Sequence, residues 1–123
     1  MTQPLAIVFY ERLMPGSQLV NRLQDLNYRV LAVTDLAALP ECVRTETPML
    51  LLVDLDAYAD VCAAIEKIKA DPTSAHVPVI AFAPDDRPEL LEAAQKAGAG
   101  FISGETALAS HLPQLLDRAL QVE

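Results

Sequence analysis

The chain has 123 residues, of which 52% are hydrophobic, and this suits one domain, residues 1–123, with a sizeable core and no room for a second. Its 9 basic and 17 acidic residues give a formal net charge of −8 without a basic cluster. This argues against a nucleic-acid partner, because binding a phosphate backbone depends on Lys and Arg. The sequence shows no run of about 18 apolar residues and no signal peptide, so we expect no membrane span and a cytoplasmic location. Cys42 and Cys62 are expected to be reduced core or boundary residues.

Five segments rich in apolar and β-branched residues predict strands. They are Leu5–Phe9, Tyr28–Val33, Met49–Val53, Val77–Ala83 and Ala99–Ser103. The third segment is apolar at every position and is followed by Asp54 and Asp56. A strand without alternation is buried on both faces, so its carboxylates emerge where it leaves the core. In the fourth segment, Pro78 must lie near the start of the strand, because proline cannot donate a hydrogen bond to the sheet.

Apolar residues at helical spacing between these strands predict five helices. They run from Leu19 to Asn27 after Pro15-Gly16-Ser17, from a cap at Thr34 or Asp35 to about Arg44, from Val61 to Ala70, from Pro88 to Ala97 with Gly98 as C′ residue, and from Ser110 onward. Pro40 disfavours the second helix unless that helix starts near Leu39. The last helix is expected to begin at Ser110 rather than Thr106, because Pro113 is tolerated in a first turn but not in a helix interior.

Strands that alternate with helices through short loops predict a parallel sheet with helices on both faces, which is a three-layer, doubly wound α/β/α fold. In such sheets, ligands bind beyond the C-terminal ends of the strands, an edge that we call the rim. The residues expected at the rim are Tyr10, Glu11, Asp54, Asp56, Ala83 and Ser103 or Gly104. The rim is therefore acidic, and it is the one site that the sequence indicates.

Three motifs follow one another along the chain: Val53-Asp54-Leu55, His76-Val77-Pro78-Val79-Ile80 and Ala97-Gly98-Ala99. Their order and spacing resemble the receiver (CheY-like) domain of bacterial response regulators over essentially the whole chain. Phe101 falls where that family carries its switch aromatic. The resemblance implies a flavodoxin-like sheet with strand order 2-1-3-4-5. It also implies that Asp54 holds the position of the phosphoacceptor, which takes a phosphoryl group from the phosphohistidine of a kinase.

The chain departs from the family around this acceptor position. In the family, an acidic pair that holds Mg²⁺, a hydroxyl and a lysine neutralise the charge there, whereas this chain has Tyr10-Glu11, Ala83 and Gly104. Losing a cation or a hydroxyl that acts on the transition state typically costs about 3 kcal/mol. We therefore interpret the domain as a degenerate receiver (pseudo-receiver), not an enzyme, with at most self-phosphorylation of Asp54 from a phosphodonor. Without a hydroxyl at Ala83, Phe101 is expected to be packed rather than to switch.

The same resemblance implies the partners and cofactors. The expected partner is a histidine kinase or another signalling protein, or a second copy of the chain. The contact face is expected on the helix Pro88–Ala97, the strand Ala99–Ser103 and the last helix. No cofactor is required, and Glu11, Asp54 and Asp56 are the candidate ligands for weak binding of Mg²⁺, because this cation prefers oxygen ligands.

Two alternatives to the degenerate receiver stay open. The first is a working but atypical phosphoacceptor in which Glu11 and Asp54 still hold Mg²⁺. The second is a flavodoxin-type small-ligand binder, in which the backbone of Gly16 and Ser17 donates to a phosphate group. The acidic rim disfavours the second alternative.

Two further groups of rim residues have simple structural interpretations. Tyr10 is either an ordinary strand-end aromatic residue or a hydroxyl donor to Asp54. The charged cluster Asp85-Asp86-Arg87 is expected to be a solvated face.

Overall fold

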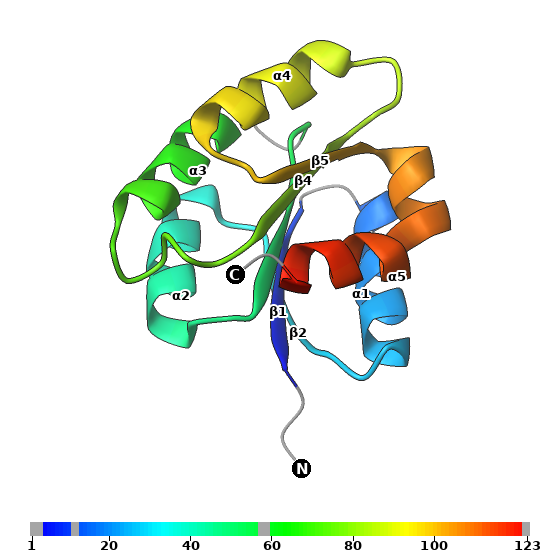
Figure 1. Ribbon diagram of the computed structural model, residues 1–123, viewed down its shortest axis with the longest axis horizontal. Coiled ribbons are helices and arrows are strands. Elements are labelled where there is room, and N and C mark those ends of the chain that lie inside the picture. The colour runs from blue at the N-terminus through cyan, green and yellow to red at the C-terminus, as the bar shows by residue number, and fades with distance from the viewer. Residues whose placement is uncertain (1–3, 11–12, 57–59, 122–123) are drawn as a thin grey trace.

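Five parallel strands form one sheet in the computed structural model, which describes residues 4–10, 13–56 and 60–121 (Figure 1). The strands are β1 (Leu5–Phe9), β2 (Arg29–Val33), β3 (Leu50–Asp54), β4 (Val79–Ala83) and β5 (Phe101–Gly104). Their order in the sheet is β2-β1-β3-β4-β5, and each pairing is parallel. The expected doubly wound fold with strand order 2-1-3-4-5 is therefore confirmed.

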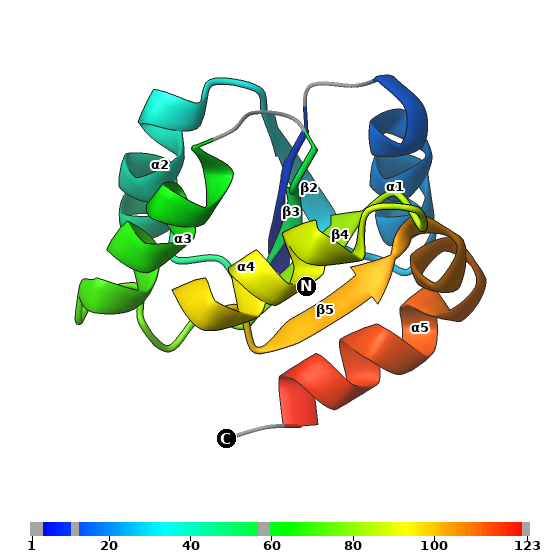
Figure 2. The same ribbon diagram turned by 90° about the horizontal axis from the view of Figure 1, so that it is seen from above.

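Helices cover both faces of this sheet, as Figure 2 shows from above. They are α1 (Leu13–Asp25), α2 (Leu39–Glu46), α3 (Val61–Ala70), α4 (Pro88–Ala97) and α5 (Glu105–Gln121), with a short 3₁₀ turn, η1 (Leu36–Ala38), before α2. α1 and α5 lie on one face, whereas α2, α3 and α4 lie on the other. The molecule thus has the three layers that the alternation of strands and helices predicts.

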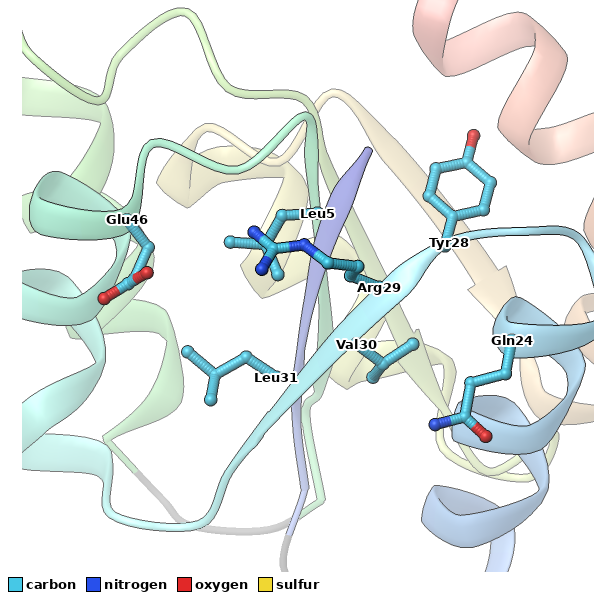
Figure 3. A pocket seen from close by; sticks show the side chains of 7 residues that line it. All are labelled: Leu5, Gln24, Tyr28, Arg29, Val30, Leu31 and Glu46. Carbon is cyan, nitrogen blue, oxygen red and sulfur yellow. The ribbon is translucent and has the colours of Figure 1, made fainter. Parts of the chain in front are cut away.

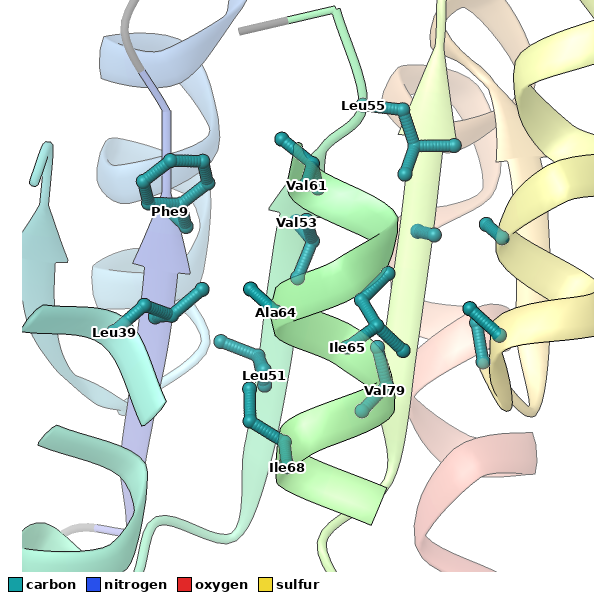
Figure 4. Close-up of a cluster of buried hydrophobic side chains, with 14 of the residues drawn as sticks. Phe9, Leu39, Leu51, Val53, Leu55, Val61, Ala64, Ile65, Ile68 and Val79 are labelled. Atoms are coloured by element: carbon teal, nitrogen blue, oxygen red, sulfur yellow. The ribbon is translucent and has the colours of Figure 1, made fainter. Parts of the chain in front are cut away.

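The sheet separates two hydrophobic cores, and β3 contributes to both. Leu51 and Val53 point into the core beneath α2, α3 and α4, where they pack around α3 (Figure 4). Leu50 and Leu52 point into the core beneath α1 and α5. All four side chains are fully buried, as expected for a strand without polar alternation. Met49 was expected in this strand, but it precedes β3 and is 50% exposed, because the first pair in register with β1 is Leu50 with Ala6.

Helix α1 starts earlier than the sequence pattern predicts. It begins at Leu13, so Pro15 lies in its first turn, where the missing N–H costs no helical hydrogen bond. The expected stop at Asn27 is confirmed, since this residue adopts a left-handed backbone with φ 70° two residues after the helix ends.

Helix α2 starts near Leu39, which is the start that Pro40 permits. Asp35 caps the preceding η1 turn by accepting a hydrogen bond of 3.1 Å from the N–H of Ala37. α2 itself begins at Leu39, so Pro40 occupies its first turn. The expected helix limit near Leu39 is confirmed.

Helix α5 corrects the expected start at Ser110. It begins at Glu105, but His111 has non-helical dihedral angles of φ −125° and ψ 28°, which divide the helix at a kink. Pro113 therefore lies in the first turn after the kink, where it displaces no helical N–H. Pro113 thus lies in a first turn, as expected. The prediction missed the helical segment that precedes the kink.

Two smaller expectations also have an outcome. Cys42 and Cys62 are free thiols at partly buried positions, as expected. Among the described residues, no helix is long and apolar enough to cross a membrane.

Gly98 ends α4 in a conformation that other residues rarely adopt, with φ 117°. A Cβ atom built on Gly98 lies 3.0 Å from Cγ of Lys69, whereas one built on Gly100 has no atom within 4 Å. Lys69 has little freedom to yield, because its Nζ donates to the carbonyl oxygens of Ala75 and Val77 at 3.1 and 2.7 Å. Position 98 is thus restricted both by its backbone and by its neighbour.

We therefore predict that Gly98→Ala lowers the free energy of unfolding by about 1–3 kcal/mol. The matched variant Gly100→Ala should change it by no more than about 0.5 kcal/mol. Urea denaturation followed by circular dichroism measures both values. Equal effects of the two substitutions would contradict the restriction at position 98.

Candidate functional site

The described residues of the rim come from the C-terminal ends of four neighbouring strands. Asp54 ends β3 and Ala83 ends β4, where it pairs in register with Gly104 at the end of β5. Tyr10 directly follows β1, whose last residue pairs with Val53. The structure thus brings Tyr10, Asp54, Ala83 and Gly104 to one edge, as expected. Asp56 lies in the loop that follows β3, and Glu11, the remaining expected rim residue, lies outside the described residues.

Asp54 is fully buried, with 0% of its surface exposed. One carboxylate oxygen, Oδ1, accepts a hydrogen bond of 3.0 Å from the backbone N–H of Asp56. Such a bond from the following loop holds a carboxylate in a fixed orientation and compensates part of the cost of burying it.

The positions next to Asp54 carry apolar groups. Ala83 is fully buried in the core beneath α2, α3 and α4, and it offers no hydroxyl. Tyr10 is half-buried and packs against the core beneath α1 and α5, as an ordinary strand-end aromatic residue does. Phe101 is also half-buried and packs against that same core.

The loop between β4 and α4 makes charged contacts at the rim, and its residues Asp85, Asp86 and Arg87 are exposed, as expected of a solvated face. Nη1 of Arg87 lies 3.3 Å from Oδ1 of Asp56, and Nε of Arg87 donates to Oε2 of Glu89 at 2.5 Å. On the side of α5, Asp85 accepts hydrogen bonds from the backbone N–H and the hydroxyl of Thr106. The pattern of charges could not indicate these contacts, because the partners lie 31 and 21 residues away in sequence.

Gly104 occupies the position of the family's lysine, and its surroundings explain why it has no side chain. A Cβ atom built on Gly104 overlaps Oδ1 of Asp85. The carboxylate of Asp85 therefore fills the space in which a side chain at position 104 begins. Any larger residue there must displace Asp85.

The candidate divalent-cation site of Glu11, Asp54 and Asp56 stays a prediction, because Glu11 lies outside the described residues. Within residues 4–10, 13–56 and 60–121, no group of three His, Cys, Asp or Glu side chains is arranged to hold a metal ion. The carboxylate of Asp56 faces Arg87, a cation that competes with a metal for this oxygen. We therefore assign no step of chemistry to Mg²⁺.

Gly16 and Ser17, the residues that the flavodoxin-type alternative assigns to a phosphate group, lie inside α1, at its fourth and fifth positions. Beyond the first turn of a helix, backbone N–H groups donate to carbonyl oxygens of the preceding turn. This placement disfavours phosphate binding by these residues, and the alternative stays a prediction.

A hollow of about 630 Å³ lies away from the rim, beside the N-terminal ends of β1 and β2 (Figure 3). Leu5, Tyr28, Arg29 and Glu46 are among its lining residues. Burial, together with the nearby charge of Asp117, raises the pKa of the Tyr28 phenol. The residues of this hollow make no convergent set of catalytic groups, so the rim remains the candidate site.

No known family model matches the sequence, and no curated protein matches it. Several solved structures share the fold. The receiver domain of the sensor histidine kinase PA1611 from Pseudomonas aeruginosa, with a magnesium ion coordinated in its active site cleft, has a TM-score of 0.86 and 19% identity over 97% of this chain and 98% of that one. The receiver domain of NtrX from Brucella abortus has a TM-score of 0.84 and 18% identity over 96% and 99%.

A two-component response regulator of the LuxR family from Aurantimonas sp. has a TM-score of 0.81 and 16% identity over 97% of this chain and 86% of that one. The structural neighbours of this chain are thus receiver domains of response regulators and a kinase. At these identities, the similarity establishes the receiver fold.

The ion pair between Arg87 and Glu89 yields a pH-dependent prediction. The hydrogen bond from Arg87 holds the pKa of Glu89 below its ordinary value of 4.5. A lowered pKa in the folded state means that the stabilisation is present above the ordinary pKa and is lost as the pH falls through the lowered one. Titration of the side-chain carboxyl of Glu89 by NMR should show this depression. Arg87→Gln should reduce it but not abolish it, because a backbone hydrogen bond at Glu89 also lowers the pKa.

The matched control is Lys96→Gln, which removes a cation from the other end of α4. It should leave the pKa of Glu89 unchanged, because Coulomb interactions between exposed charges are screened over that distance. A pKa of Glu89 that does not respond to Arg87→Gln would contradict the assigned pair.

Proposed function

We propose that this chain is a receiver-like signalling domain that acts through protein contact, without efficient phosphorylation of Asp54. One observation carries the proposal: the carboxylate at the acceptor position is fully buried beside strand ends that supply Ala83 and Gly104. The similarity to receiver domains supports the signalling role. The missing groups support a mechanism other than phosphoryl transfer.

The chemistry of phosphorylation explains why these groups matter. Transfer of a phosphoryl group to a carboxylate brings two anions together, so the transition state needs nearby positive charge and hydrogen-bond donors. The side chain of Ala83 donates no hydrogen bond, and Gly104 supplies no cation. At about 3 kcal/mol for each lost group, the combined loss corresponds to a rate reduction of roughly four orders of magnitude.

Arg87 does not replace the missing lysine. Its guanidinium group contacts Asp56 and Glu89, so two carboxylates already share its donors. Nearly half of its side chain is exposed, and water screens the charge at such a position. The rim therefore keeps an acceptor position without the electrostatic environment that activates it.

The face of α4, β5 and α5 is the proposed contact surface for a histidine kinase, another signalling protein or a second copy of the chain. β5 is an edge strand, and Phe101 and Ile102 are half-buried on it. Exposed residues of α4 and α5 border this strand, among them Lys96 and Thr106. A partly apolar strip with a polar border is the usual composition of a protein contact.

We predict that acetyl phosphate or beryllofluoride with Mg²⁺ leaves the protein without a stoichiometric adduct. Intact-mass spectrometry detects phosphorylation, and NMR detects a beryllofluoride complex through shifts at Asp54 and Asp56. Asp54→Ala is the matched control, and a receiver domain with the complete set of partner groups should react under the same conditions. A metal-dependent adduct that disappears in Asp54→Ala would establish the alternative, an atypical but working phosphoacceptor.

A further inference from the structure

The residue that directly precedes α5 has no side chain with which to cap the helix. Gly104 directly precedes the helix, at the position where Ser, Thr, Asp or Asn usually accepts hydrogen bonds from the first turn. The first N–H groups of a helix have no partner within the helix, and the positive end of the helix dipole lies there. An acceptor for this end must therefore come from elsewhere in the molecule.

Asp85 supplies that acceptor from the loop between β4 and α4. Its Oδ1 accepts from the backbone N–H of Thr106 at 3.4 Å, and its Oδ2 accepts from the hydroxyl of the same residue. Both carboxylate oxygens of Asp85 are thus used at the first turn of α5, across 21 residues of sequence. The negative charge also lies at the end of the helix dipole that attracts it.

The contact of Asp85 with Thr106 depends on the residue at position 104. A Cβ atom at position 104 overlaps Oδ1 of Asp85. A side chain at position 104 therefore makes the carboxylate of Asp85 move from the position in which it binds Thr106. The capping contact in its present geometry thus depends on glycine at position 104.

The same loop is held at a second point, where Arg87 pairs with Asp56 beyond the end of β3. A turn in the loop, closed by a hydrogen bond of 3.0 Å from the N–H of Arg87 to the carbonyl oxygen of Pro84, joins the two points. The loop leads directly into α4, which begins at Pro88. A contact that fixes the loop to α5 thus also fixes the start of α4 relative to α5.

We propose that Asp85 acts as a built-in latch, in which its carboxylate takes the place of a side chain at position 104, caps α5 and holds α4 and α5 in one arrangement. This inference rests on the proposed function in one respect: the face that it holds is the proposed contact surface. The face is then preformed, and its conformation does not depend on the state of Asp54.

A double-mutant cycle on the full chain tests the latch. In the native background, Gly104→Ala displaces Asp85 and should reduce the folding equilibrium constant about tenfold, as measured by urea denaturation. In the Asp85→Ala background, the space is empty, and the same Gly104→Ala substitution should change the constant by less than about threefold. Equal effects in the two backgrounds would overturn the steric relation on which the latch depends.

Hydrogen exchange provides a readout at the capped group itself. Asp85→Ala should accelerate exchange of the Thr106 amide by about tenfold or more, because the amide loses its acceptor. Asp85→Asn keeps one carbonyl oxygen and should preserve most of the protection. The matched control is Asp86→Ala, which removes the neighbouring exposed carboxylate and should leave the exchange of Thr106 unchanged. An unchanged rate in Asp85→Ala would overturn the capping contact.

NMR chemical shifts test the link between the loop and the face. Asp85→Ala should shift or split amide resonances along α4 and β5, whereas Asp86→Ala should affect only its immediate neighbours. Effects of Asp85→Ala that stay within the loop would overturn the preformed face. A phosphodonor adduct at Asp54 contradicts the proposed function and leaves the outcome of the cycle unaffected. Additive substitutions in the cycle contradict the latch and leave the phosphodonor result unaffected.

Discussion

The burial of β3 on both faces is the constraint on which the rest of the structure depends. Its side chains from Leu50 to Val53 alternate between two cores and are fully removed from water. Such a strand is stable only in the middle of a parallel sheet with helices on each side. Parallel strands in turn need crossover connections, and these bring the C-terminal ends of all strands to one edge. The rim is therefore a consequence of how the hydrophobic strand is covered.

This constraint also explains the state of Asp54. The carboxylate belongs to the last residue of the buried strand, so it inherits a position without solvent exposure. Burial of an ionisable group is costly unless hydrogen bonds or opposite charges compensate it. The N–H of Asp56 provides one such hydrogen bond. Burial and this hydrogen bond together define the environment of the carboxylate at the end of β3.

The loop between β4 and α4 makes contacts at the rim through its charged side chains. Its two charged contacts, from Asp85 to Thr106 and from Arg87 to Asp56, connect both sides of the rim. Where the family resemblance implies a lysine after β5, glycine leaves room for a carboxylate from this loop. The side chains of these contacts lie outside the two hydrophobic cores, so the fold does not depend on them.

The sequence by itself determined the class of fold, the order of the elements and the acidic edge of the sheet, because these follow from local patterns. Apolar runs predict buried strands, Gly98 ends a helix through its own backbone, and Pro40 and Pro113 restrict where helices begin. It also indicated which expected groups are absent at the rim, since Ala83 and Gly104 are visible as residue types. The helical segment before His111 escaped prediction, because Pro113 excludes a continuous helix and the sequence did not indicate the kink that separates the two segments.

Only the tertiary structure decided how the rim is closed. Asp85, Thr106 and Gly104 come together because β4 and β5 are neighbours in the sheet, and no local pattern relates residues 21 positions apart. The burial of Asp54 likewise depends on packing from several elements. The sequence shows that Asp85, Asp86 and Arg87 carry charge. Which groups these charges contact is decided by the fold, because the energy of a charge depends on its surroundings.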